Sequence, residues 1–148
     1  MINIFHKKQL LEPGFCFFDI DGVLNTESDW QFRYYFRKNL VKKFCEYCKK
    51  YNYEPVMISS WRTGFMGPDH FDNLPHIKKL EEEFKNNGIT LKYKTPVLKS
   101  KSRDQEIERF LYYHPVSRYI IIDDDKNEYG TITDHNHFVN SKVGFQLS

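Results

Sequence analysis

The sequence has no long apolar run, few cysteines and almost no net charge. Its longest purely apolar stretches, such as Phe15–Phe18 and Ile120–Ile122, are far shorter than the roughly 20 residues that cross a bilayer. The first 14 residues lack the continuous apolar segment of a secretion signal, and three cysteines cannot all pair within one chain. These absences exclude a membrane-spanning helix and favour a reducing, cytoplasmic setting.

The charge balance does not by itself indicate a class of binding partner. The 22 Lys and Arg residues nearly cancel 20 Asp and Glu residues, so the formal charge of +2 does not call for a nucleic acid or an anionic membrane. Hydrophobic residues make up 40% and charged residues 28% of the 148 residues, which is typical of a folded protein. The length predicts one domain over residues 1–148, and the sequence carries no signal for an oligomeric state.

Strand-like and helix-like segments alternate along the chain. Short apolar runs bounded by turn residues predict buried strands at residues 15–20, 55–58, 89–93 and 118–122. Helical spacing of apolar residues predicts helices over Gln31–Tyr51, from Leu74 to a C-terminal Gly88, and after a capping box at Ser102 and Gln105. This order predicts an α/β fold, a three-layer sandwich with a mostly parallel central sheet.

Polar residues follow the predicted strands, where ligands bind in such folds. They are Asp19 and Asp21 after the first strand, Ser59, Ser60 and Arg62 after the second, and Asp123, Asp124 and Asp125 after the fourth. Carboxylates that converge repel one another unless a cation is present, and oxygen ligands without histidine or thiolate favour Mg²⁺. A carboxylate nucleophile, a second acid, a hydroxyl and a basic residue together suit phosphoryl chemistry.

Several of these residues also have a structural interpretation. Asp21-Gly22 is a common turn dipeptide, Ser59 can cap a helix, and Arg62 can form a surface ion pair instead of holding a phosphate. Trp61 is either a core residue or a base-stacking residue. The C-x₂-C pair Cys45 and Cys48 lies inside an amphipathic helix, which favours packing over zinc binding.

Basic residues are unevenly spread along the chain. Residues 31–50 contain seven Lys or Arg and one Glu, and residues 92–103 contain five basic residues and no acid. A solvated face is the usual explanation of such clusters. The second cluster precedes the helix expected to bind phosphate, where a polyanionic substrate would gain from it.

The strand-end residues carry a family resemblance. The run Asp19-Ile-Asp-Gly-Val-Leu24 resembles the first motif of the haloacid dehalogenase (HAD) superfamily of phosphohydrolases. Ile58-Ser59 resembles the second motif and Ile122-Asp-Asp-Asp125 the fourth. The third motif is a lone basic residue, for which Lys101 and Arg103 compete.

A narrower resemblance is to a small capless subgroup, some members of which occur as domains in RNA-repair proteins. It is carried by Ser59-Ser-Trp-Arg62, by Arg103-x-x-Glu-Ile107 and by the tail His137–Phe145, which resembles that subgroup's last strand and turn. The resemblance spans Phe15 to the end of the sequence. It implies a HAD-like, Rossmannoid fold without a large cap domain.

The resemblance also implies catalytic roles. Asp19 would be the nucleophile, and Asp21 would be the general acid and base. Ser59 would bind the phosphoryl group, and Lys101 or Arg103 would stabilise it.

The same resemblance implies the metal ligands. Asp19, the backbone carbonyl of Asp21 and the carboxylate of Asp124 would bind Mg²⁺, with Asp123 as the alternative to Asp124. Ser60 and Arg62 are the candidates for further substrate contacts.

Together these features predict a Mg²⁺-dependent phosphomonoester hydrolase that acts through an aspartyl-phosphate. The expected substrate is a nucleotide or the terminal phosphate of a nucleic acid. Two alternatives stay open: a non-catalytic HAD-like protein that binds a phosphorylated ligand or a protein, and a phosphotransferase that uses an acceptor other than water.

Overall fold

The computed structural model describes residues 12–125, 129 and 136–148, and these residues form a five-stranded sheet. The strands lie in the order β3-β2-β1-β4-β5, and every neighbouring pair is parallel. Their bounds are β1 Gly14–Phe18, β2 Tyr53–Met57, β3 Tyr93–Lys94, β4 Tyr119–Asp123 and β5 Asn136–Phe138. The two strands that lead into the predicted acids, β1 and β4, are therefore neighbours in the middle of the sheet.

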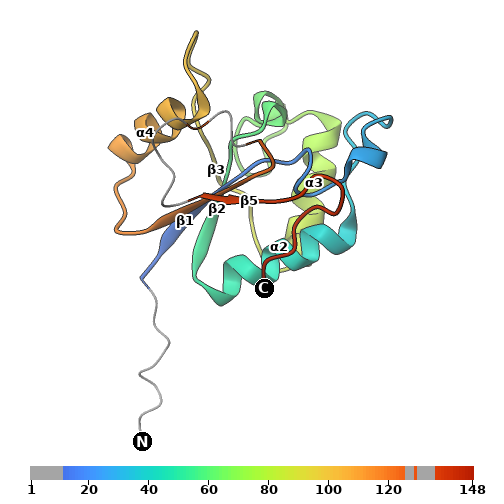
Figure 1. Cartoon of the computed structure of the whole chain (residues 1–148). Helices are drawn as coiled ribbons and strands as arrows, with labels where there is room; N and C mark the ends of the chain where they lie inside the picture. Colours follow the sequence, from blue (N-terminus) through green and yellow to red (C-terminus); the bar gives the residue numbers. More distant parts are fainter. Residues whose placement is uncertain (1–11, 126–128, 130–135) are drawn as a thin grey trace, which may run out of the picture.

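Helices cover both faces of this sheet. Helices α2 (Lys38–Lys50) and α3 (Pro75–Asn86) lie on one face, and α4 (Arg103–Tyr113) lies on the other (Figure 1). Two short 3-10 turns, η1 (Glu27–Asp29) and η2 (Ser60–Gly64), follow β1 and β2. This arrangement confirms the predicted α/β three-layer sandwich.

The apolar pattern of β1 explains the two faces. Cys16 and Phe18 belong to the cluster shared with α2 and α3, whereas Phe15 and Phe17 pack with residues of α4. All four side chains are buried, so β1 reads as a continuous apolar run and not as an alternating one. This is the pattern of a central parallel strand with a helix layer on each side.

Helix caps match the signals in the sequence. Ser102 and Gln105 form the expected capping box at the start of α4, with the Ser102 N–H donating to Gln105 Oε1 at 3.0 Å. Gly88 has a φ of +83° and ends α3, where the Ile89 N–H donates to the Phe84 carbonyl at 3.0 Å. A glycine tolerates this left-handed conformation without a Cβ penalty.

Two predicted elements differ from the structure. The helix predicted over Gln31–Tyr51 begins only at Lys38, because Arg37 is extended and residues 31–36 form an irregular segment. The aromatic residues of that segment imitate helical spacing, although Phe32 is exposed. The strand predicted over residues 89–93 is also wrong in extent, since only Tyr93–Lys94 pairs with β2.

The stretch between β1 and α2, residues 19–37, is too short to hold a separate cap domain. The tail contains β5 followed by a turn at Asn140–Gly144, as expected for the last strand and turn. Across the part of the chain that the structure describes, no helix combines the length and apolarity needed to cross a bilayer.

Candidate active site

Three carboxylates meet at the carboxyl ends of β1 and β4. The strands pair Phe18 with Ile122, so the next residues, Asp19 just after β1 and Asp123 at the end of β4, lie side by side. The Asp19 N–H donates to the Ile122 carbonyl at 3.0 Å and fixes this register. One oxygen each of Asp19, Asp123 and Asp124 lies within 4.8 Å of the others. We call these three residues the acid cluster.

Arg103 provides a positive charge at the acid cluster. Its Nη1 lies 2.7 Å from Asp123 Oδ2 and 3.3 Å from Asp19 Oδ2. Arg103 is the first residue of α4, so the start of that helix points its guanidinium at the ends of β1 and β4. Lys101, the other candidate for the third motif, is exposed in the loop before the helix. The structure thus brings only Arg103 of this pair to the carboxylates.

Asp123 is held more firmly than its neighbours. It is completely buried, and its Oδ2 accepts hydrogen bonds from Arg103 at 2.7 Å and from the Tyr129 hydroxyl at 2.6 Å. Its Oδ1 accepts from the Asp125 N–H at 3.1 Å. Two donors use the lone pairs of Oδ2, so Asp123 has at most one further lone pair to offer. Asp124 is only partly buried and lies closer to the surface.

Burial and mutual repulsion perturb the acids. Burial raises the pKa of Asp19 well above its usual range, the Asp123 charge raises it further, and Arg103 opposes both effects. Burial, followed by the contact with Asp123, raises the pKa of Asp124 to about 6. Burial alone would lower the pKa of Arg103, but Asp19 and Asp123 outweigh it and raise that pKa. Three carboxylates share one guanidinium, so the fully ionised cluster would carry more negative charge than Arg103 balances.

This donor set fits a hard divalent cation. Carboxylate oxygens from Asp19 and Asp124 face one another within 4.8 Å, and their uncompensated charge would be neutralised by Mg²⁺. The cysteines among the described residues lie elsewhere, buried in the core. A site built only from oxygen ligands does not favour zinc.

The second acid of the first motif stands beside the cluster in a different environment. Asp21 is partly buried, and its Oδ1 accepts a hydrogen bond from Asn25 Nδ2 at 2.9 Å. Gly22 between them has a φ of +86° and lies against Asp124, where a Cβ would collide with the Asp124 carboxylate. The turn therefore needs glycine both for its backbone conformation and for its close approach to β4.

The two serines that follow β2 differ in exposure and in their contacts. Ser59 is buried and caps η2, its Oγ accepting from the Trp61 N–H at 3.2 Å. The capping role expected from the sequence is thus present. Ser60 is exposed and lines the same groove as Asp21, which leaves its hydroxyl free to meet a substrate.

Arg62 is a buried brace and not a surface residue. Its guanidinium donates to the Ile58 carbonyl at 2.6 Å, the Ser59 carbonyl at 3.0 Å and the Thr95 carbonyl at 3.1 Å. It also pairs with buried Glu106 of α4 at 2.8 Å. Neither sequence interpretation, a surface ion pair or a phosphate contact, describes these contacts. Arg62 instead ties the end of β2 to the segment after β3 and to α4.

Sequence reasoning missed three residues that shape the site. Asn25 orients Asp21, Tyr129 binds Asp123, and Glu106 anchors Arg62. Asn25 follows Asp21 by four residues in the first motif, and Glu106 belongs to the quoted run Arg103-x-x-Glu-Ile107, so both had a positional signal. Tyr129 had none, because its contact depends on the path of the chain after β4.

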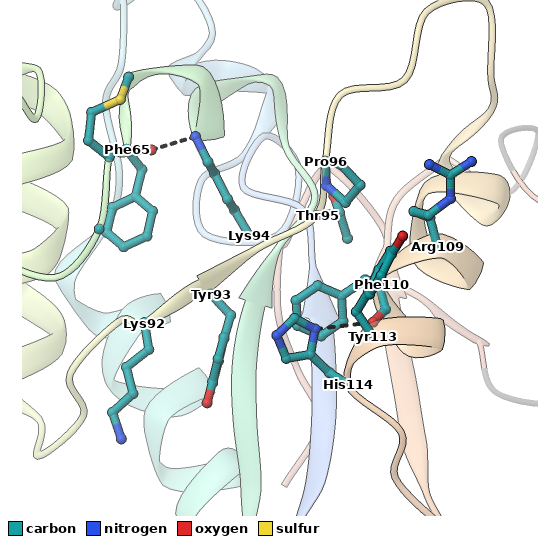
Figure 2. Close-up of a pocket in the computed structure, with 12 residues that line it drawn as sticks. Phe65, Lys92, Tyr93, Lys94, Thr95, Pro96, Arg109, Phe110, Tyr113 and His114 are labelled. Carbon is teal, nitrogen blue, oxygen red and sulfur yellow. Dashed lines mark hydrogen bonds between the residues drawn. The ribbon is translucent and has the colours of Figure 1, made fainter.

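A separate hollow lies beside the edge strand β3 and helix α4. It has a volume of about 480 Å³, and aromatic side chains such as Tyr93, Phe110 and His114 line it (Figure 2). Lys94 reaches away from these rings and donates to the Phe65 carbonyl at 2.5 Å (Figure 2). Because its lining holds no carboxylate, this hollow lacks the groups for the expected chemistry.

The comparison with known proteins agrees with this geometry. The family described as the HAD domain in Swiss Army Knife RNA repair proteins has a model that matches residues 15–148. No curated protein matches the chain. The match covers nearly the whole sequence, including both strands that carry the acid cluster and the helix that carries Arg103. The chain therefore belongs to the family of HAD domains found in Swiss Army Knife RNA repair proteins.

Proposed function

We propose that the protein is a Mg²⁺-dependent phosphomonoesterase in which Asp19 is the nucleophile. The observation that carries this proposal is the acid cluster, in which Arg103 lies 3.3 Å from Asp19 and 2.7 Å from Asp123. Buried carboxylates around a single guanidinium are costly for folding, so their presence in one place suits a site that handles a cation and a phosphate.

In the first step, an oxygen of Asp19 attacks the phosphorus atom and the bond to the leaving oxygen breaks. Asp21 protonates that oxygen, and the product alcohol leaves. In the second step, water attacks the phosphorus atom of the aspartyl-phosphate while Asp21 takes up its proton. The bond between phosphorus and Asp19 breaks, which releases phosphate and restores the carboxylate.

Asp21 suits this alternating role because of its surroundings. It lies outside the acid cluster, is partly exposed, and is oriented by Asn25 at 2.9 Å. It can therefore exchange a proton with the substrate and with water while the carboxylates of the acid cluster stay buried. Asn25 is proposed as a positioning residue for this acid.

Arg103 and Ser59 would hold the phosphoryl oxygens. Arg103 already neutralises part of the charge on Asp19, and it would share its guanidinium with the incoming phosphate. Ser59 follows the neighbouring strand β2, and the hydrogen bond from the Trp61 N–H fixes its hydroxyl. We propose Arg103, and not Lys101, as the basic residue of the third motif.

Asp19, Asp124 and the backbone carbonyl of Asp21 would hold Mg²⁺, which would offset the charge of the phosphoryl group during transfer. Asp124 is proposed as the direct ligand in preference to Asp123. Three protein donors already occupy the Asp123 oxygens, at 2.6, 2.7 and 3.1 Å. Asp123 would then position Arg103 and balance part of its positive charge.

The proposed substrate is a nucleotide or the terminal phosphate of a nucleic acid. Membership in a family of HAD domains from RNA repair proteins supports this class. The stretch of residues 19–37 leaves no room for a cap domain, and an uncapped site can admit the end of a long substrate.

Phosphate release from a panel of esters tests the proposal. The panel contains an aryl phosphate, mononucleotides, sugar phosphates and oligonucleotides with a 3′- or 5′-phosphate, each with Mg²⁺ and with chelator. We expect release only with Mg²⁺, and a loss of at least about 10³-fold in kcat for Asp19→Asn, as for a removed nucleophile. Asp72→Asn, an exposed acid outside the cluster, is the matched control. Normal turnover by Asp19→Asn would refute the assignment of the nucleophile.

A further inference from the structure

The segment of residues 30–37, which links η1 to α2, exposes an unusual number of large rings. Trp30 is 48% exposed, Phe32 57%, Tyr34 39% and Tyr35 45%. We call these residues, with Arg33 and Arg37, the aromatic segment. Contiguous exposed rings on a folded domain mark an interaction site more often than a solvated loop.

One side of the aromatic segment forms a groove next to the proposed general acid. This first groove has a volume of about 410 Å³. Its lining combines ring and polar side chains: Asp21, Trp30, Phe32, Arg33, Tyr34, Ser60 and Trp61. A substrate whose leaving oxygen meets Asp21 would therefore place its next chemical group against these rings.

The rings beside Asp21 are fixed in place. Asn25 donates from Nδ2 to Asp21, and its Oδ1 accepts from Trp30 Nε1 at 2.9 Å. The side-chain amide of Asn25 thus orients both the carboxylate of Asp21 and the indole ring of Trp30. Tyr34 stacks on His76 with ring centroids 3.6 Å apart, in a left-handed backbone conformation with a φ of +56°. Such a conformation persists only where surrounding contacts hold it.

The ends of the aromatic segment are also tied together. Asp29 precedes it, and Arg37 closes it with two hydrogen bonds to that carboxylate, from Nε at 2.7 Å and from Nη2 at 3.1 Å. A bidentate pair of this kind adds geometric precision as well as energy. The segment is therefore a rigid surface feature, and little ordering would be needed when a ligand binds.

A second groove borders the aromatic segment, and most of the charged residues that line it are basic. It has a volume of about 910 Å³ and shares Phe32, Arg33 and Tyr34 with the first groove. Lys38 and Lys79 also line it, with Arg37. Within the lining of this groove, the one carboxylate is Asp29, which Arg37 already neutralises. We call the two grooves together the track: Asp21 lines the first groove, Arg37, Lys38 and Lys79 line the second, and Arg33 lines both.

We infer that this track binds a single strand of nucleic acid that ends at the acid cluster. The base next to the reacting phosphate would stack in the first groove, and the backbone phosphates of the following nucleotides would meet Arg33, Lys38 and Lys79. Stacking rings interleaved with basic residues are the features that bind single strands without reading sequence. A base can enter the first groove only when it is unpaired. This inference rests on the proposed function, which places the reacting phosphate at Asp19.

A length series of single-stranded oligonucleotides tests the track through turnover. We expect kcat/KM to rise as a phosphorylated strand is lengthened from one nucleotide to about four, since each nucleotide adds a stack or a phosphate contact. Phe32→Ala should lower kcat/KM on a hexanucleotide by about tenfold more than on an aryl phosphate. Phe32→Trp should restore it, because the stacking face returns. Tyr112→Ala removes a ring that is 78% exposed on α4 and serves as the matched control.

Direct binding separates this inference from the proposed function. Fluorescence anisotropy of a labelled, phosphorylated hexanucleotide is measured on Asp19→Asn protein, where turnover is blocked. Three phosphate contacts predict a slope of about −2 for log K against log salt. A duplex with a blunt end should bind less well than the single strand.

The outcomes are distinct. If phosphate release depends on Asp19 while strand length, Phe32→Ala and salt have no effect, the track is wrong and the proposed function stands. If no ester is hydrolysed but the hexanucleotide binds in a Phe32-dependent manner, the track stands and the proposed function is wrong. Equal affinity for duplex and single strand would also overturn the stacking of an unpaired base.

Discussion

Replacing Asp19 by asparagine should make the metal-free protein more stable, although it removes the proposed nucleophile. Asparagine has the same shape but no charge. Asp19 lies within 4.8 Å of two other carboxylates and 3.3 Å from Arg103. At an effective dielectric constant of about 20, each acid contact at such a separation costs about 3.5 kcal/mol, and the Arg103 contact offsets about 5 kcal/mol. The substitution therefore relieves about 2 kcal/mol.

Arg103 keeps a partner after this change, since Asp123 remains 2.7 Å away. The variant thus avoids the penalty of leaving a buried guanidinium unpaired. For a chain of this length, 2 kcal/mol corresponds to a rise of about 6 °C in Tm. The assay is thermal unfolding with chelator at pH 8, followed by circular dichroism.

The pH dependence gives a second check on the same prediction. The pKa of Asp19 is raised in the folded protein by burial and by Asp123, so the folded state keeps its proton to higher pH than the unfolded state does. The cost of the Asp19 charge is therefore absent below the unfolded pKa and grows as pH rises through the folded pKa. The advantage of Asp19→Asn over the wild type should be larger at pH 8 than at pH 4.

Mg²⁺ should reverse the order of stability. A cation bound by the carboxylates stabilises the wild type by mass action and has less to bind in Asp19→Asn. A variant that is less stable than the wild type at pH 8 with chelator would refute the reasoning that the acid cluster carries excess negative charge.

Two further predictions concern residues outside the reacting groups. Arg62→Met leaves Glu106 buried without its cation and should lower the free energy of unfolding, measured with urea, by about 3–5 kcal/mol. A loss below about 1 kcal/mol would contradict the structural role of Arg62. Burial raises the pKa of Cys45 to about 12, so Cys45 and Cys48 should react with a disulfide reagent only after unfolding. Rapid reaction of the folded protein or stoichiometric zinc uptake would contradict their assignment to the core.

The layers of the fold and the convergence of the acids could be predicted from the sequence. Central parallel strands are continuous apolar runs, and the residues that follow them must meet at one edge of the sheet. This rule places Asp19 and Asp123 at the same end of the sheet, and the pairing of β1 with β4 in the structure makes them neighbours. It needs no knowledge of side-chain contacts, because the register of β1 and β4 decides the outcome.

The choice between Lys101 and Arg103 could not be made from the sequence. Both are basic, and they lie two residues apart at the start of a helix. Which one meets the carboxylates depends on where the first helical turn begins, and in the structure α4 starts at Arg103. A shift of two residues turns a side chain by about 200° around a helix axis. Helix boundaries read from a sequence are uncertain by about as many residues, so the sequence could not decide which side chain faces the carboxylates.

The aromatic segment shows where periodicity misleads. Phe32 and Phe36 lie four residues apart and match the buried face of the helix that follows, so the pattern extends the helix too early. The structure stops it because Arg37 turns back to Asp29 and not along the helix axis. The Arg62 brace was missed because two of its partners, Thr95 and Glu106, are distant from it in sequence.

The buried Arg62 brace would also separate two properties of the proposed site: how the phosphoryl group is held, and which ester is selected. Arg62 binds the Ser59 carbonyl and Glu106, and Glu106 lies one helical turn after Arg103, so the groups proposed to hold the phosphoryl oxygens belong to one rigid unit. Under the proposed function, a cradle of fixed shape would recognise the phosphoryl group and would make few demands on the rest of the ester. Selectivity is then left to the exposed residues 30–37, which could be exchanged in evolution or by design while the chemistry stays intact.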